Sequence, residues 1–235
     1  MANLDFNRYK ILTFDCYGTL IDWESGIFSA LRPILAAHRK SMTDAQLLEI
    51  YGELEAQAER GEYRSYRDVL QLVVSGFGKR LGFEPTEQEK RSLPDSLANW
   101  LPFADTVAAL ERLKSRFKLA IISNVDDDLF AITARRLRIN FDHVITAQQA
   151  RCYKPGLDIF KLALKTIGFP PEQVLHCGQS VYHDVIPAQS FGMSTVWVNR
   201  PSPRAGIGAV KSASGKPDLE VPNLETLANM ALSEN

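Results

Sequence analysis

Short apolar runs alternate with helical patterns along most of this chain, and no other feature of the sequence constrains the fold as strongly. The runs are rich in Val, Ile and Leu, which is typical of parallel strands covered on both faces. Between them, apolar residues recur at helical spacing. The alternation predicts an α/β fold built on a doubly wound parallel sheet. The predicted strands lie at residues 11–14, 119–122, 144–146, 174–177 and 195–198, and the predicted helices at 106–117, 127–137, 157–167 and 184–191.

Residues 23–97 break this alternation, because they show helical periodicity and no convincing strand. Three amphipathic helices can be traced within them from the spacing of their apolar residues. We therefore expect a helical cap domain over residues 23–97, inserted after the first strand, and an α/β core domain made of residues 1–22 and 98–235. The stretch 199–218 is rich in Pro, Gly and Ser, which predicts a surface loop, and a closing helix is expected around Leu227.

Charge and composition exclude several classes of partner. The 235-residue chain has a net charge of -1, so it has no electrostatic footprint for nucleic acid or an anionic membrane. No apolar run approaches the roughly 20 residues that span a bilayer, and the first residues are too polar for a signal peptide. The three cysteines, Cys16, Cys152 and Cys177, are odd in number and lack metal-type spacing. We therefore expect a cytoplasmic protein that binds neither nucleic acid nor a membrane.

Polar side chains follow four of the predicted strands, at the point where each strand ends. In open α/β sheets, sites form at the carboxyl ends of the strands. The sequence therefore predicts a site that combines two carboxylates, a lysine, small hydroxyls and an amide. The residues are Asp15, Tyr17 and Thr19 after the first strand, Ser123 and Asn124 after the second, Lys154 after the third, and Ser180 and Asp184 after the fourth.

These strand ends resemble the four ordered motifs of the haloacid dehalogenase superfamily of hydrolases. "DCYGTL", "ISN", Lys-Pro and "GQSVYHD" match in order across the whole core, and the helical insert falls where that family carries its cap. The resemblance implies that Asp15 is a nucleophile, which forms an ester that water later opens. Lys154 would keep Asp15 ionised, and Thr19 and Ser123 would hold its oxygens.

Two positions separate this chain from the phosphatases of that superfamily. A phosphatase carries a second aspartate two residues after the nucleophile, where this chain has Tyr17, and an acid that helps to hold magnesium, where this chain has Gln179. Magnesium usually requires carboxylate oxygens. The pattern resembles the metal-free branch, the L-2-haloacid dehalogenases. That branch implies a small 2-haloacid as substrate, no cofactor and no metal, and its relatives are often dimers, so a homodimer is also an expectation.

The same resemblance implies roles for the remaining residues. A departing halide needs hydrogen-bond donors or a positive edge and no proton, so the amide of Asn124 and the aromatic edges of Tyr17 and Trp23 would contact the substrate. Asp184 would position and activate the water that opens the ester. Lys154 would hold the carboxylates of Asp15 and Asp184 in position relative to each other. Ser180 belongs to the same motif as Asp184.

Several alternatives remain open at this stage. Asp184 could cap the helix that follows it, since Asp is favoured there, and Ser123 could satisfy turn backbone. The family's dehalogenases carry a halide-binding arginine early in the cap, at a place that falls near Gly52 here. Instead, this chain has Arg60, Arg64 and Arg67 further along. The alternative functions are a magnesium-dependent phosphatase and a catalytically weak binding protein of the same fold.

Overall fold

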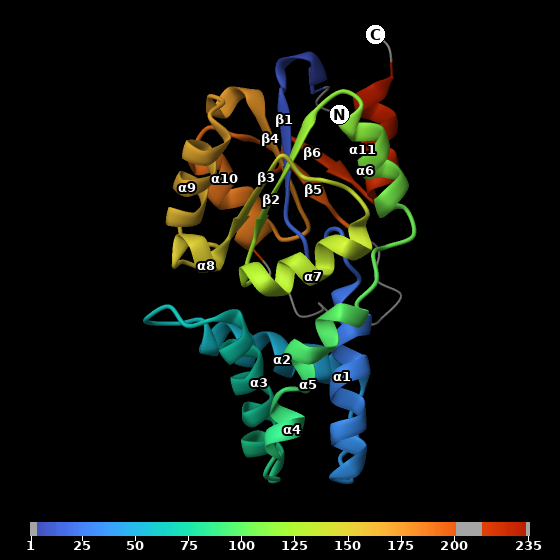
Figure 1. Cartoon of the computed structure of the whole chain (residues 1–235), viewed down its shortest axis with the longest axis vertical. Coiled ribbons are helices and arrows are strands. Elements are labelled where there is room, and N and C mark those ends of the chain that lie inside the picture. Colours follow the sequence, from blue (N-terminus) through green and yellow to red (C-terminus); the bar gives the residue numbers. More distant parts are fainter. Residues whose placement is uncertain (1–3, 201–212, 234–235) are drawn as a thin grey trace.

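The computed structural model, which describes residues 4–200 and 213–233, is built around one parallel sheet (Figure 1). Its six strands run in the order β3-β2-β1-β4-β5-β6, and every neighbouring pair is parallel. All four residues of β1 are buried, as expected for a strand covered on both faces. The strands are β1 (Ile11–Phe14), β2 (Lys118–Ser123), β3 (His143–Thr146), β4 (Val174–Gly178), β5 (Ser194–Val198) and β6 (Leu219–Val221).

The central position of β1 decides where a site can form. Phe14, the last residue of β1, lies opposite Ile121 of β2 on one side and Cys177 of β4 on the other. The strand order reverses here, because β2 and β4 leave β1 in opposite directions. Ligands bind in the crevice beyond the strand ends at such a point. The residue that follows β1, Asp15, therefore lies at the centre of the expected site.

Helices cover both faces of the sheet, which confirms the predicted doubly wound α/β fold. In Figure 1, α6 and α11 pack together on one side of the sheet, and α9 and α10 lie on the other. The closing helix is present as α11, while β6 was not predicted. The core helices are α6 (Thr106–Lys114), α7 (Asp127–Leu137), α8 (Ala147–Ala150), α9 (Asp158–Ile167), α10 (Ile186–Ser190) and α11 (Leu224–Leu232), with short turns η1 (Phe6–Arg8), η2 (Leu97–Asn99), η3 (Pro171–Gln173) and η4 (Val181–Val185).

Most of the predicted loop at residues 199–218 falls on residues 201–212, outside the described residues. Its remaining described residues carry no helix or strand, and β6 begins directly after it. No helix in the described part of the chain is both long and apolar enough to cross a membrane.

The helices α1 to α5 form a separate block beyond the carboxyl ends of the strands (Figure 1). We propose that the cap comprises residues 23–97. The longer helices begin at side chains that accept hydrogen bonds from their first turns, at Asp22, Thr43 and Ser65. The cap helices are α1 (Trp23–Ala37), α2 (Asp44–Ala58), α3 (Tyr66–Leu81), α4 (Glu87–Lys90) and α5 (Ser92–Ser96).

Asp126 joins the core to the cap. Its carboxylate accepts hydrogen bonds from the backbone N–H groups of Tyr66 and Arg67, both at 2.9 Å, and from the hydroxyl of Tyr63 at 3.2 Å. The side chain is buried, and it makes no capping bond to its own helix α7. A core carboxylate thus caps the first turn of cap helix α3, where negative charge is favoured, and fixes how the cap lies on the core.

Candidate active site

The turn after β1 presents Asp15 to the space between core and cap. Gly18 makes this turn with a φ of +91°, a conformation that L side chains rarely adopt. The turn brings the hydroxyl of Thr19 to the carboxylate of Asp15, and this hydroxyl donates a hydrogen bond of 2.8 Å to Oδ2. The Thr19 oxygen accepts in turn from the backbone N–H of Gln179 at 2.9 Å. Oδ2 of Asp15 is therefore held in place by Thr19, which is itself bonded to the Gln179 backbone.

Lys154 holds the other oxygen of Asp15. Its ammonium group donates to Asp15 Oδ1 at 2.8 Å, to Asp184 Oδ1 at 2.6 Å and to the carbonyl of Ile122 at 3.0 Å. These bonds use all three of its protons. Burial alone would lower the pKa of Lys154, but the two carboxylates outweigh it and raise that pKa. Lys154 therefore stays charged in a site that is almost closed to solvent.

The two carboxylates differ in their pKa values. Burial raises the pKa of Asp15, and the pull of Lys154 does not fully offset it. For Asp184, burial is outweighed by Lys154 and His176, which hold its pKa well below the usual range. His176 Nε2 lies 3.3 Å from Asp184 Oδ1, and its Nδ1 lies 2.8 Å from the hydroxyl of Thr13. Asp15 is thus the more basic carboxylate and the better nucleophile, and divergent pKa values in one site indicate divided roles.

Gly178 allows Asp184 to reach this cluster. A Cβ at residue 178 would lie 2.4 Å from Asp184 Cγ, closer than side chains approach one another. The chain then forms the π-helical turn η4, a form that is frequent at functional sites. The Ser180 hydroxyl accepts from the backbone N–H of His183 at 3.0 Å, and the Ser180 N–H donates to Asp184 Oδ2 at 3.2 Å. Asp184 therefore accepts from several donors besides Lys154.

Ser123 and Asn124, at the end of β2, have different surroundings. Asn124 Oδ1 accepts from the backbone N–H of Lys154 at 2.7 Å, and Nδ2 donates to its carbonyl at 3.1 Å. The amide is thus bonded at both ends and positions Lys154. In contrast, the Ser123 hydroxyl is buried and has no hydrogen-bond partner among the described residues. A buried hydroxyl without a partner is costly unless something binds it.

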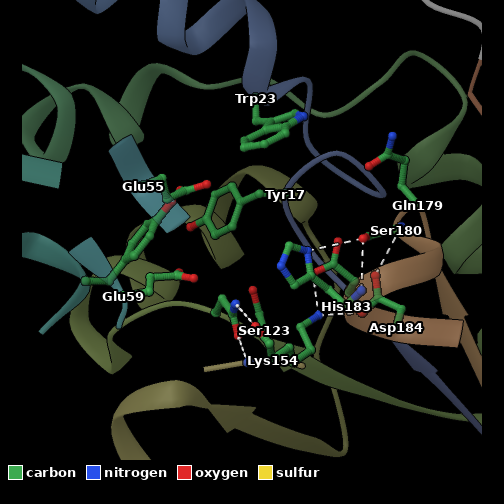
Figure 2. A pocket seen from close by; sticks show the side chains of 13 residues that line it. Tyr17, Trp23, Glu55, Glu59, Ser123, Lys154, Gln179, Ser180, His183 and Asp184 are labelled. Carbon is green, nitrogen blue, oxygen red and sulfur yellow. Dashed lines mark hydrogen bonds and ion pairs between the residues drawn. The ribbon is translucent and has the colours of Figure 1, made fainter. Parts of the chain in front are cut away.

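A small cavity of about 70 Å³ lies between the core and the cap (Figure 2). Every predicted site residue lines it except Thr19, which contacts Asp15 from behind. The Tyr17 hydroxyl is bonded to Thr133 at 2.8 Å, so its ring stands fixed in the wall. The cavity has room for a small molecule. The lining comprises Asp15, Tyr17, Trp23, Glu55, Glu59, Tyr66, Ser123, Asn124, Lys154, Gln179, Ser180, His183 and Asp184.

Sequence reasoning missed part of this wall. Glu55, Glu59 and Tyr66 come from the cap, and His183 comes from η4. A signal for two of them existed in the sequence, because Glu55 of α2 and Glu59, the C-cap of that helix, continue the four-residue spacing of the buried Tyr51.

The three cap arginines lie outside the cavity. The side chains of Arg60 and Arg64 are exposed, and Arg67 pairs with Asp128 at 2.6 Å. The cavity lining contains no arginine. None of the three therefore takes the place of the family's halide-binding arginine in this structure.

Known proteins share both the sequence pattern and the fold. The model of the haloacid dehalogenase-like hydrolase family matches residues 9–192. An (S)-2-haloacid dehalogenase from Pseudomonas fluorescens is 26% identical over 219 residues, which is 92% of this chain and 93% of that protein. The L-2-haloacid dehalogenase of Xanthobacter autotrophicus, solved with chloropropionic acid covalently bound, superposes with a TM-score of 0.78 at 24% identity, over 94% of this chain and 98% of that one.

A hydrolase from Bacillus subtilis solved with bound magnesium shares the fold almost as closely, with a TM-score of 0.77 at 21% identity, over 95% of this chain and 99% of that one. Fold similarity alone therefore does not distinguish metal-free from magnesium-dependent chemistry. The family match extends from just before β1 to just before β5 and includes all four motifs. The chain belongs to the haloacid dehalogenase-like hydrolases.

Proposed function

We propose that this protein removes halide from small 2-haloacids by hydrolysis, with Asp15 as nucleophile and without a metal ion. One observation carries the proposal. Asp15 is held by Lys154 and Thr19 in the wall of a small cavity, and the residue two positions on is Tyr17, whose hydroxyl is a weaker acid than a carboxyl group and is bonded to Thr133. Burial raises the pKa of Tyr17 well above its usual value. A halide leaves without a proton, so this arrangement suits a carbon–halogen bond.

In the first step, a carboxylate oxygen of Asp15 attacks C2 of the acid. The new C–O bond forms as the C–X bond breaks, and the halide leaves with the electron pair. Lys154 and Thr19 fix the angle of attack, since each holds a different oxygen of Asp15. The aromatic edges of Tyr17 and Trp23 are the groups proposed to face the halide.

In the second step, water attacks Cγ of the Asp15 ester. Its proton passes to Asp184, the acceptor beside Lys154, and collapse of the tetrahedral intermediate releases the 2-hydroxy acid and restores Asp15. The net reaction consumes one water and yields one halide and one proton. Ser180 and Asn124 act as positioning residues, because Ser180 binds Asp184 and Asn124 binds the Lys154 backbone.

The side chains around Asp15 do not suit the binding of magnesium. Lys154 already donates to one oxygen each of Asp15 and Asp184, the two core carboxylates that would have to hold a dication. Gln179, at the position where a phosphatase has an acid, offers a neutral amide. Among the described residues, no group of three or more His, Cys, Asp or Glu side chains could hold a metal ion. Mg²⁺ prefers carboxylate oxygens, so this chemistry supports a mechanism without it.

The test is halide release from L-2-chloropropionate in EDTA, with Asp15→Asn as the inactive control. A single turnover in ¹⁸O-labelled water should place the label on Asp15 and leave the first product unlabelled, because water opens the ester at Cγ. Label in the product and none in the protein would refute the ester. Phosphate release from an aryl phosphate that requires magnesium, with no halide release, would support the phosphatase instead.

A further inference from the structure

Two cap carboxylates, those of Glu55 and Glu59, line the same cavity as Asp15. Glu55 and Glu59 of α2 and its C-terminal end point toward the core residues (Figure 2). Lys154 is the only lysine or arginine in the described lining, and its three protons are already donated. Among the described lining residues, none from the cap carries a positive charge that could balance the two glutamates.

The two glutamates are not equivalent. Glu55 accepts hydrogen bonds from the hydroxyls of Tyr51 at 2.9 Å and Tyr66 at 2.7 Å. The carboxylate of Glu59 has no hydrogen-bond partner in the described part of the chain, and burial together with the charge of Glu55 raises its pKa well above the usual value. A cation beside Glu59 would offset both effects. Glu59 is therefore the carboxylate that most needs a ligand.

Aromatic rings surround these carboxylates. Tyr17, Trp23 and Tyr66 line the same cavity, and Trp23 also packs edge-on against Tyr51, with ring centroids 5.9 Å apart. Aromatic faces attract organic cations, and such rings combined with carboxylates are a recurring way to bind ammonium groups. The cap wall thus has the composition of an ammonium site.

The floor of the cavity, formed by the core, offers a hydrogen-bond donor, whereas the cap wall offers acceptors. The Ser123 hydroxyl lies in the core wall, is 1% exposed as a residue and has no partner in the described residues. A hydroxyl can donate to a carboxylate oxygen. A donor on the floor and acceptors on the cap wall suit a ligand that is negative at one end and positive at the other.

We propose that the preferred substrate is a small 2-haloacid whose far end carries an ammonium group. Ser123 binds its carboxylate, Glu59 and the ring of Tyr66 on the cap wall bind its ammonium, and C2 lies between them, over Asp15. The inference rests on the proposed dehalogenase function and names its substrate class. The ammonium takes no part in bond making or breaking.

A matched pair of substrates tests this directly. 4-Amino-2-chlorobutanoate and 2-chloropentanoate have the same configuration at C2 and nearly the same shape, but one ends in an ammonium and the other in a methyl group. Halide release is followed at about pH 7.5, where an alkyl ammonium is protonated, with an enzyme-free blank to subtract cyclisation. A charge-assisted hydrogen bond predicts kcat/KM about 10- to 100-fold higher for the amine.

Glu59→Gln should reduce that ratio to within about threefold of one, since the amide keeps the shape and removes the charge. The ratio is internally controlled, because a folding defect would lower both rates together. Glu49→Gln, on the exposed face of the same helix, should leave the ratio unchanged.

The outcomes separate the two proposals. Equal rates on both substrates, or a faster rate on 2-chloropentanoate, would overturn the ammonium site and leave dehalogenation standing. A ratio unaffected by Glu59→Gln would also overturn it. Halide release from neither substrate, nor from L-2-chloropropionate, would refute dehalogenation itself.

Discussion

Replacing Lys154 with methionine should destabilise the protein in a way that depends on pH. The substitution keeps most of the side-chain volume and removes the ammonium that joins Asp15 and Asp184. Removing one partner from a buried ion pair costs about 3–5 kcal/mol. Domains of this kind have a free energy of unfolding of about 5–15 kcal/mol, so the variant should fold with reduced stability. For a chain of this size, the loss corresponds to a Tm lower by about 6–20 °C.

The sign of the pH dependence follows from the two carboxylates. In the wild type, the pKa of Asp184 is lowered, so its contribution to stability is present above the unfolded value of about 4 and lost as pH falls through the folded value. Without Lys154, burial and mutual repulsion raise both pKa values above those of the unfolded chain. The variant then loses stability as pH rises above about 4. The difference between the two proteins should therefore be largest near neutral pH and shrink toward pH 4.

Urea unfolding followed by tryptophan fluorescence, at about pH 4.5 and about pH 8, measures this difference. Lys161→Met is the matched control, because Lys161 pairs with Asp158 on the surface, with 62% of its side chain exposed. Such a pair contributes about 0–1 kcal/mol. A Lys154→Met destabilisation that is the same at both pH values would show that the loss reflects packing, and would refute the charge argument.

Three further substitutions test other contacts. Thr19→Val should raise the apparent pKa of the acidic limb, in the pH profile of kcat/KM for halide release, by about 1–2 units. The reason is that a hydrogen bond from a hydroxyl to ionised Asp15 is worth about 1.5–3 kcal/mol; an unchanged pKa would contradict this. Gly178→Ala should cut halide release at least about tenfold, since its Cβ would lie 2.4 Å from Asp184 Cγ, and activity near wild type would count against the assigned role. Asp126→Asn should speed hydrogen exchange in the first turn of α3 by removing its charged cap, and unchanged exchange would show that the cap is held by other contacts.

The central residues of the site could be predicted because they follow the predicted strands along the chain. Asp15, Lys154 and Asp184 each follow an apolar run, and parallel strands bring their carboxyl ends to one edge whatever the loop lengths. Their bonding partners were harder to predict. His176 lies inside β4, where every residue is buried. The alternation of side chains along a strand therefore does not indicate that His176 contacts Asp184.

The cap wall could not be predicted in the same way. Helical periodicity gives the buried face of α2, but it does not say whether that face meets other helices or the cavity. That depends on how the cap lies on the core, which tertiary contacts such as that of Asp126 with α3 decide. The position of Glu55 and Glu59 is thus set by contacts between residues far apart in the sequence. Strand β6 was missed because its three residues are too few to show a pattern.

The strand order also determines when the site can exist during synthesis. β1 is the first strand to be made, yet its neighbour β4 begins at Val174, and Lys154 follows Asp15 by 139 residues. Until β4 is made, one edge of β1 has no partner and can pair with another chain. Pairing over such long separations is slow. A nascent chain therefore carries Asp15 long before Lys154 and β4 can hold that carboxylate in place, and release or truncation before β4 should produce aggregation and no partial activity.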